Sequence, residues 1–212
     1  MFHHFHGSGH RPGPGSISAE CLHHIIDHIS ALRPILPARD FVDLVANGRL
    51  SDDATCLTFD DALRCQIDIA VPVLKDRGLT GFFFIPTSVL TDQPDLVEVY
   101  RHFRLTHFDG MGAFLESFEQ HVDSALEGRV STSFSDDITD SYLAGYHFYS
   151  REDRRFRFIR DRLLSRDEFG LVMADMMDSR GYDPVGASRA LYADRNCIAD
   201  LHHMGHVVGM HS

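Results

Sequence analysis

One stretch of six residues, Cys56-Leu57-Thr58-Phe59-Asp60-Asp61, decides the fold of this chain, because an apolar run leads there into two adjacent carboxylates. It predicts a buried strand over residues 54–59 whose carboxyl end opens into a polar site. Successive side chains of a strand point to opposite faces, so both carboxylates share a site only if the backbone turns after the strand. One could then bind a cation while the other handles a proton. Alternatively, one of them caps a following helix, since Asp is a common N-cap residue.

A second strand follows and completes a βαβ unit. Helical spacing predicts a helix over residues 65–77, in which Pro72 indicates a kink or a late start. The continuous apolar run Thr80–Ile85 predicts a strand that is buried on both faces of a parallel sheet. Because the crossover between the two strands is right-handed and the strands are parallel, both end at the same edge. Enzymes of the α/β class place their sites at this edge.

The N-terminal segment carries a cluster of histidines, namely His3, His4, His6 and His10. A weak alternation over residues 1–6 suggests a short strand, and residues 7–15 form a loop rich in Gly and Pro. The histidines either reach the mouth of a site or belong to a partly exposed loop, which is the interpretation we favour. Helices with apolar stripes are predicted after this loop over residues 18–32 and 40–46.

Residues 91–195 have a different character, because β-branched runs disappear and helical spacing dominates. The candidate helices are Leu96–Phe103, Met111–Leu126, Asp137–Tyr146, Arg154–Leu164 and Asp167–Met177. We interpret the aromatic group over residues 142–149 as core rather than as a carbohydrate platform. The arginine-rich run over residues 151–166 is interpreted as a solvated helix face paired with nearby carboxylates, the alternative being a surface for a polyanion.

Composition limits the class of protein. The chain has 212 residues, 43% of them hydrophobic, which suits one domain with a large insertion and a packed core. A formal charge of −11 argues against nucleic-acid binding as the main activity. The four cysteines form no CxxC pair and indicate reduced, buried thiols, with Cys56 in the core strand. No membrane span or secretion signal is visible, so we expect a cytoplasmic enzyme.

Two motifs near the ends of the chain resemble those of a known family. The run Thr58-Phe59-Asp60-Asp61-Ala62 is similar to the first motif of the polysaccharide deacetylases, the NodB-homology family or carbohydrate esterase family 4, which usually reads Thr-Phe-Asp-Asp-Gly. Residues 206–212 predict a short apolar strand that ends in His211 and Ser212. The run Gly205-His206-x-x-Gly209-x-His211-Ser212 is similar to the start of the second motif, and the segment Gly78–Ile85 resembles the second strand of the family. The resemblance covers about residues 50–90 and 196–212.

The resemblance implies a fold of the α/β class, the N-terminal part of a distorted (β/α) barrel of the NodB or polysaccharide deacetylase type. In this interpretation residues 1–90 belong to the barrel, residues 91–195 are a large helical insertion, and residues 196–212 return to the barrel. The insertion could form a lid or a wall of the substrate groove. Ala62 replaces the usual glycine of the first motif, which matters only if this position needs a positive φ.

The resemblance also implies the chemistry, which is metal-dependent removal of acetyl groups from N-acetylated sugars of a poly- or oligosaccharide. This is hydrolysis of a carbon–nitrogen bond other than a peptide bond. Asp60 would be the catalytic base, and Asp61 and His211 would be ligands of a divalent metal, most often zinc. Such a site leaves open positions for water and for an acetamide carbonyl. The expected partner is an N-acetylated glycan, and neither a nucleic acid nor a membrane is expected.

The family pattern places the second histidine ligand and the later motifs beyond Ser212. We therefore expect a C-terminally truncated deacetylase, whose exposed strand edges would make residues 1–212 behave poorly in solution. His202, His203 or His206 could substitute as ligands, although His206 is interpreted as a structural residue. Two other functions stay open, an inactive or regulatory remnant of such an enzyme and a metal-dependent hydrolase of another substrate class.

Overall fold

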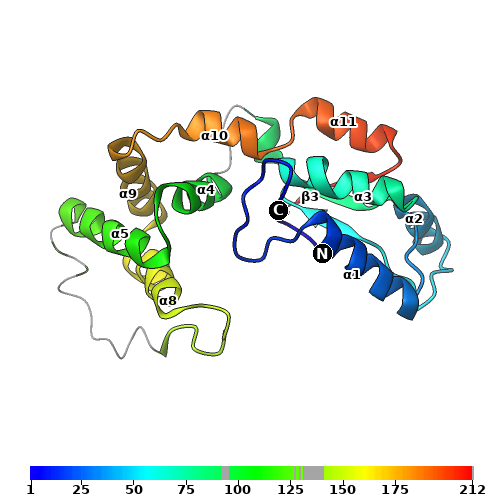
Figure 1. Ribbon diagram of the computed structural model, residues 1–212, viewed down its shortest axis with the longest axis horizontal. Coiled ribbons are helices and arrows are strands. Elements are labelled where there is room, and N and C mark those ends of the chain that lie inside the picture. Colours follow the sequence, from blue (N-terminus) through cyan, green and yellow to red (C-terminus); the bar gives the residue numbers. More distant parts are fainter. Residues whose placement is uncertain (92–95, 127, 129, 131–140, 212) are drawn as a thin grey trace. The chain divides into compact units, whose positions relative to one another are not determined.

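The chain divides into two compact units in the computed structural model (Figure 1). The structure describes residues 1–91, 96–126, 128, 130 and 141–211. Unit 1 consists of Met1–Asp95 together with Val185–Ser212, and unit 2 is Leu96–Pro184. Unit 1 is mixed α/β, and the described part of unit 2 is helical. The assignment of residues to a barrel and an insertion stays a prediction.

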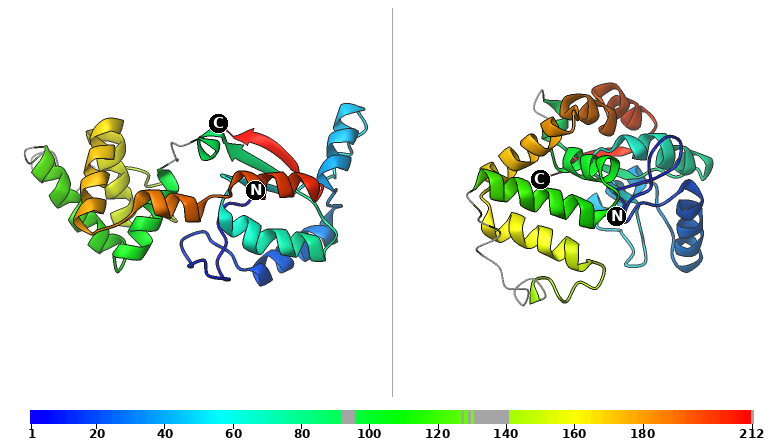
Figure 2. Two further views of the ribbon diagram at one scale, coloured as in Figure 1. Left: turned by 90° about the horizontal axis from the view of Figure 1, so that it is seen from above. Right: turned by 60° about the vertical axis from the view of Figure 1, so that its left-hand side comes forward.

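A parallel sheet is the centre of unit 1. Its strands, in the order in which they pair, are β1 (Thr58–Asp60), β2 (Phe82–Pro86) and β3 (Val207–His211). Asp60 pairs with Phe84 and Pro86 pairs with His211, so β1 and β3 end at the same edge of the sheet. In the left view of Figure 2 the arrows of β2 and β3 run side by side towards the end marked C. The strands predicted over residues 54–59, 80–85 and 206–212 and their common edge are confirmed, whereas closure into a barrel stays a prediction. The short strand predicted over residues 1–6 is wrong, because this segment forms only isolated bridges, at Phe2 and Phe5.

Helices connect the strands of unit 1. They are α1 (Ala19–Leu32), α2 (Ala38–Ala46), the π-helical turn η1 (Gln66–Ala70), α3 (Val71–Asp76), the 3₁₀ turn η2 (Thr87–Leu90), α10 (Pro184–Leu191) and α11 (Arg195–His203). The helix predicted over residues 65–77 is confirmed, but its late start is wrong, because the π-helical turn η1 runs directly into α3. Pro72 lies in the first turn of α3, directly after this irregular turn. The structure adds α10, which the sequence analysis did not predict.

Stacked aromatic rings form the core of unit 1. The rings of Phe59 and Phe83 are stacked with their centroids 4.7 Å apart, and both side chains are essentially inaccessible to solvent. Phe2 and Phe5 of the N-terminal segment pack on Phe59 at 5.5 and 6.2 Å. Burying each such ring contributes about 1.5–3 kcal/mol. The core therefore holds the N-terminal segment against the end of β1, and Leu22 brings α1 onto the same cluster.

Strand β2 differs from the prediction that both of its faces are buried. Phe83 and Ile85 are buried, whereas Phe82 and Phe84 on the other face are half-buried. The short helix α2 covers this second face only in part, with the ring of Phe41 edge-on to Phe82 at 5.8 Å. The expectation of a sheet buried on both sides is therefore wrong for the part of the chain that the structure describes.

Strand β1 is shorter than predicted, because the residues before it pair elsewhere. Thr55 forms a parallel bridge with Ile35, and its carbonyl accepts a hydrogen bond from the N–H of Leu36 at 2.8 Å. Cys56 consequently precedes the strand and is half-buried, so its predicted place in the core strand is wrong. All four cysteines are free thiols, as expected, but the prediction that they are buried holds only for Cys65, because Cys21, Cys56 and Cys197 are half-buried.

Unit 2 is built from α4 (Val97–His107), α5 (Met111–Ala125), α8 (Arg151–Phe158), the π-helical turn η3 (Ile159–Leu163) and α9 (Arg166–Ser179). Phe114 and Phe118 of α5 contact Phe156 of α8 edge-on at 5.2 and 5.1 Å. Four of the five helices predicted for this region are confirmed. The fifth, predicted over residues 137–146, is described only from residue 141, where the chain forms turns, so the prediction is wrong for that part. No helix among the described residues is long and apolar enough to cross a membrane.

The arginine-rich run of unit 2 is paired in part as predicted. Arg160 contacts Asp161 at 2.6 Å, and Arg155 forms an ion pair with Glu119 of α5. The aromatic group before α8 differs from the prediction, because Tyr146 and Phe148 are 52% and 74% exposed. These rings lie in turns rather than on a buried helix face, so their interpretation as core is wrong.

Candidate functional site

Four side chains meet at the carboxyl edge of the sheet in unit 1. Asp60 and Asp61 come from the end of β1, and His211 comes from the end of β3. Nε2 of His211 lies 3.7 Å from Oδ2 of Asp60 and 3.9 Å from Oδ1 of Asp61. Nε2 of His3 lies 3.7 Å from Oδ2 of Asp60 and 3.9 Å from Oδ2 of Asp61. Each imidazole thus contacts both carboxylates, and the three residues singled out from the sequence lie together.

A left-handed turn lets two consecutive carboxylates share this site. Asp61 has a φ of 75° and Ala62 a φ of 53°, so the backbone turns immediately after β1. Asp adopts this conformation more readily than most residues, whereas Ala at positive φ costs about 1–2 kcal/mol. The replacement of the usual glycine by Ala62 therefore falls at a position that does need a positive φ. The next helical turn begins at Gln66 with Cys65 as its N-cap, so the helix-cap alternative for the carboxylates is wrong.

The two carboxylates have different environments. The side chain of Asp60 is 9% exposed, whereas that of Asp61 is 28% exposed. Both imidazoles are about one third exposed, at 37% for His3 and 33% for His211. Two carboxylates in unlike surroundings can perform unlike tasks, as acid–base pairs in enzymes do.

His3 belongs to the site, although the sequence analysis favoured a partly exposed loop for the N-terminal histidines over the mouth of a site. The N–H of Phe2 donates to the carbonyl of Thr58 at 2.8 Å, and the N–H of Asp60 donates to the carbonyl of Phe2 at 3.1 Å. This short parallel pairing places His3 beside the end of β1. The sequence suggested a short strand over residues 1–6, but nothing within that segment shows that Phe2 pairs with Phe59. His6 and His10 bind Ser16 and Asp68 instead, at 3.0 and 2.9 Å.

The histidines considered as substitute ligands lie apart from this group. His202 and His203 are exposed on α11. His206 is 3% exposed, and its Nδ1 accepts a hydrogen bond from the N–H of Gly81 at 3.0 Å. Its ring also stands edge-on to that of Phe83 at 5.0 Å. These contacts agree with the interpretation of His206 as a structural residue.

Protonation of His206 is expected to weaken the fold at acid pH. Burial lowers the pKa of His206 from its ordinary value of 6.5. The unfolded chain then binds this proton at a higher pH than the folded chain, so the free energy of unfolding falls as the pH drops below about 6.5. His206→Asn keeps an acceptor near the position of Nδ1 without a titratable ring. Its free energy of unfolding should therefore fall less than that of the wild-type chain as the pH drops. Urea unfolding followed by circular dichroism between about pH 7.5 and 5.5 measures this, and equal pH dependence in both proteins would contradict it.

The two carboxylates and two imidazoles of this site are side chains of the types that bind a divalent metal. Carboxylate oxygen and imidazole nitrogen are ligands of zinc, and the donor atoms of a tetrahedral zinc site lie about 3.4 Å apart. The corresponding distances here are 3.7 and 3.9 Å. As they stand, no three His, Cys, Asp or Glu side chains of the described residues are close enough to hold an ion. The imidazole nitrogens would have to approach the carboxylates by a few tenths of an ångström to reach the spacing of a zinc site.

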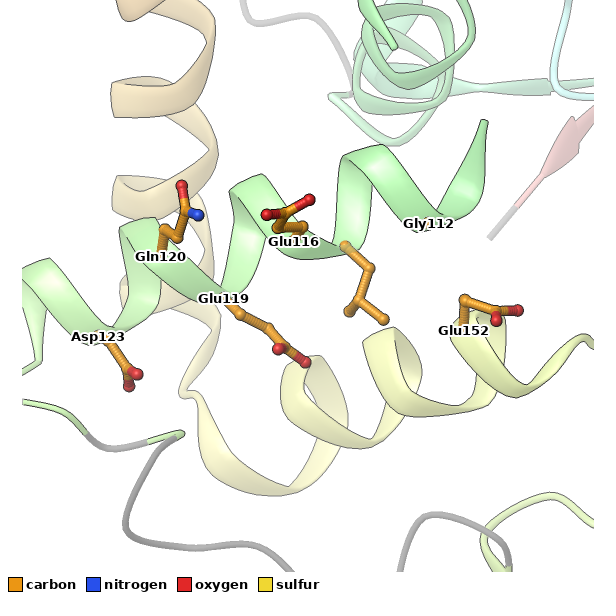
Figure 3. A pocket seen from close by; sticks show the side chains of 7 residues that line it. Gly112, Glu116, Glu119, Gln120, Asp123 and Glu152 are labelled. Carbon is orange, nitrogen blue, oxygen red and sulfur yellow. The ribbon is translucent and has the colours of Figure 1, made fainter. Parts of the chain in front are cut away.

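Unit 2 has an acidic cleft of its own (Figure 3), with a volume of about 410 Å³. It is lined by Gly112, Leu115, Glu116, Glu119, Gln120, Asp123 and Glu152. Two of these carboxylates already have partners, because Glu119 pairs with Arg155 and Asp123 accepts a hydrogen bond from the N–H of Val130 at 2.6 Å. The cleft therefore has less free negative charge than its composition suggests.

Comparison with known proteins adds little to this description. No family model and no curated protein matches the chain. Among solved structures, that of a de-N-acetylase from Aggregatibacter actinomycetemcomitans is similar over 42% of this chain, with 23% sequence identity and a TM-score of 0.33. The matched region spans 37% of that protein's chain. A TM-score this low does not define a fold, so the site must be interpreted from its own residues.

Proposed function

We propose that this chain carries the site of a metal-dependent hydrolase that removes acetyl groups from N-acetylated sugars of a glycan. The observation that supports the proposal best is the pair Asp60 and Asp61 between two imidazoles at the carboxyl edge of a parallel sheet. The resemblance of the runs around Asp61 and His211 to deacetylase motifs supplies the substrate class.

Asp61 and His211 are the proposed ligands of the divalent metal. Asp61 is the more exposed carboxylate, and the ring of His211 contacts it from the end of β3. When bound, the cation would polarise the acetamide carbonyl and increase the acidity of a water molecule. Zinc is the expected ion because the donors are nitrogen and oxygen.

Asp60 and His3 are the proposed proton carriers. Asp60 takes a proton from the attacking water, whose oxygen forms a bond to the carbonyl carbon of the acetyl group. Protonated His3 gives its proton to the sugar nitrogen as the carbon–nitrogen bond breaks, which releases acetic acid and a free amine. Transfer of the proton from Asp60 back to His3 through solvent restores both groups. The 3.7 Å separation of Nε2 of His3 from Asp60 suits such a pair.

Zinc binding by the two histidines distinguishes these roles. His211→Ala is expected to weaken zinc binding on the order of 100-fold, since a lost ligand should cost at least as much as a lost supporting contact. His3→Ala should leave the zinc affinity within about threefold and lower kcat for acetate release instead, by about 10²-fold or more. Isothermal titration calorimetry with zinc alone and acetate release from N-acetylglucosamine oligomers are the measurements. His202→Ala, an exposed histidine on α11, is the matched control.

The outcomes separate the functions that the sequence leaves open. Equal loss of zinc in the two variants would contradict the proton-donor role of His3 and make it a ligand. Tight zinc binding by the wild-type chain without acetate release would contradict the deacetylase proposal. It would favour a non-catalytic remnant, or a hydrolase of another substrate class if ester substrates were cleaved instead.

A further inference from the structure

We propose that Gln66 is a positioning residue that fixes His3 relative to Asp60. Its side chain is completely buried in η1, the first helical turn after the site. Its Nε2 donates hydrogen bonds to the carbonyl of His3 at 2.9 Å and to the carbonyl of Asp60 at 2.6 Å. Both partners are carbonyl oxygens, which only accept, so the orientation of the amide is determined. One side chain thus joins the main chains of two residues whose side chains face each other.

Packing alone does not explain an amide at this position. Oε1 of Gln66 is buried, and the described residues offer it no hydrogen-bond partner. A buried acceptor without a partner destabilises the fold, a cost that an apolar side chain of similar length would avoid. The amide is therefore explained by the two hydrogen bonds that it donates.

The N-terminal segment needs such a connection. Its pairing with β1 is a single parallel bridge between Phe2 and Phe59. One residue beyond this bridge Gln66 binds the carbonyl of His3, and further along the Sγ of Cys65 accepts a hydrogen bond from the N–H of Phe5 at 3.4 Å. Two consecutive residues at the start of η1 thus hold the segment that carries His3. The carbonyl of Asp60 shares the amide of Gln66, so the carboxylate and the imidazole have one common support.

Amide hydrogen exchange tests this connection directly. In Gln66→Met the N–H of Asp60, which donates to Phe2, should exchange at least tenfold faster. The N–H of Asp61, which donates to the carbonyl of Phe84, should keep its wild-type rate. Gln66→Asn retains the amide but is one methylene shorter, so it cannot reach both carbonyls and should show the same selective increase. In the wild-type chain the Nε2 protons of Gln66 should exchange slowly, which needs no variant.

Ile69→Met is the matched control, because it changes a buried residue of the same turn without removing a hydrogen bond. It should alter the exchange of Asp60 and Asp61 equally, if at all. Unchanged exchange of Asp60 in a folded Gln66 variant, or fast exchange of the wild-type Nε2 protons, would overturn the proposal. A parallel increase at both amides would also overturn it, since that result indicates general loss of stability.

Only the catalytic consequence of this inference rests on the proposed function. Gln66→Met should lower kcat for acetate release at least tenfold with little change in KM, and should have no further effect in a His3→Ala background. Full additivity of the two substitutions would show that Gln66 does not act through His3. Selective exchange without any acetate release would support the positioning role and contradict the deacetylase proposal, so the two can fail separately.

Discussion

Asp60→Asn is expected to lower kcat for acetate release by about 10²–10⁴-fold, the usual contribution of a general base. An amide of the same shape cannot accept the proton of water, whereas Asp61 and His211 keep their donor atoms. Zinc affinity, measured by calorimetry, should therefore change little. The position is 6% exposed, and asparagine retains its size, so the fold should also persist.

Two comparisons make this result interpretable. Asp53→Asn removes one negative charge at an exposed position before β1 and should leave kcat unchanged. Asp61→Asn, in contrast, should lose zinc binding, whereas Asp60→Asn should keep it. Full activity of Asp60→Asn would rule out its role as base, and a loss of zinc in that variant would instead make Asp60 a ligand.

Gly81→Ala is expected to lower the free energy of unfolding of unit 1 by about 2–3 kcal/mol, through overpacking at the start of β2. A Cβ at Gly81 would lie 2.9 Å from Cε2 of Phe59 and 3.0 Å from the carbonyl oxygen of Leu57. Neither neighbour can move easily, since the ring of Phe59 is fully buried and the other atom is backbone. Urea unfolding followed by circular dichroism measures the change, because the chain has no tryptophan.

Gly209→Ala provides a graded comparison in the same sheet. A Cβ there would lie 2.8 Å from Cδ1 of Phe84, whose ring is half-buried and can shift. Its effect should therefore be smaller than that of Gly81→Ala. Gly170→Ala in α9, where nothing lies within 4 Å, should stabilise its helix by about 0.5–1 kcal/mol. A neutral Gly81→Ala would show that β1 and β2 are further apart than described.

Local patterns in the sequence were sufficient for the elements that position the site. The apolar run that ends in Asp60 and Asp61 predicted β1 and its polar end, although the strand is shorter because Thr55 pairs with Ile35. The run before His211 likewise predicted β3. The degree of burial was harder to predict, since Phe82 and Phe84 are as apolar as a two-sided core requires and yet remain half-buried. How many layers cover a strand is decided by distant segments and leaves no trace in its own pattern.

For the site, too, local patterns predicted only the residues whose position does not depend on distant segments. Asp60, Asp61 and His211 could be selected because they follow strands and match motifs, and parallel strands end at one edge. His3 was considered but not favoured, because its place in the site depends on a bridge between Phe2 and Phe59. Gln66 could not be selected, because its role depends on a side-chain amide that reaches two carbonyls. The positive φ of Asp61 could not be predicted from the sequence either, although a turn of the backbone after the strand was expected.

The pairing of β2 with β3 has a consequence for how the protein is made. Val207 lies 125 positions after its partner Phe82 (207 minus 82), so the two strands leave the ribosome far apart in time. At about 5–20 residues per second, the edge of β2 waits on the order of 10 s for its partner. Until then the nascent chain presents an unpaired strand edge to every other chain nearby. The helical unit of Leu96–Pro184 is translated during this wait and can fold first, so β3 and His211 are added to a chain that is already half assembled.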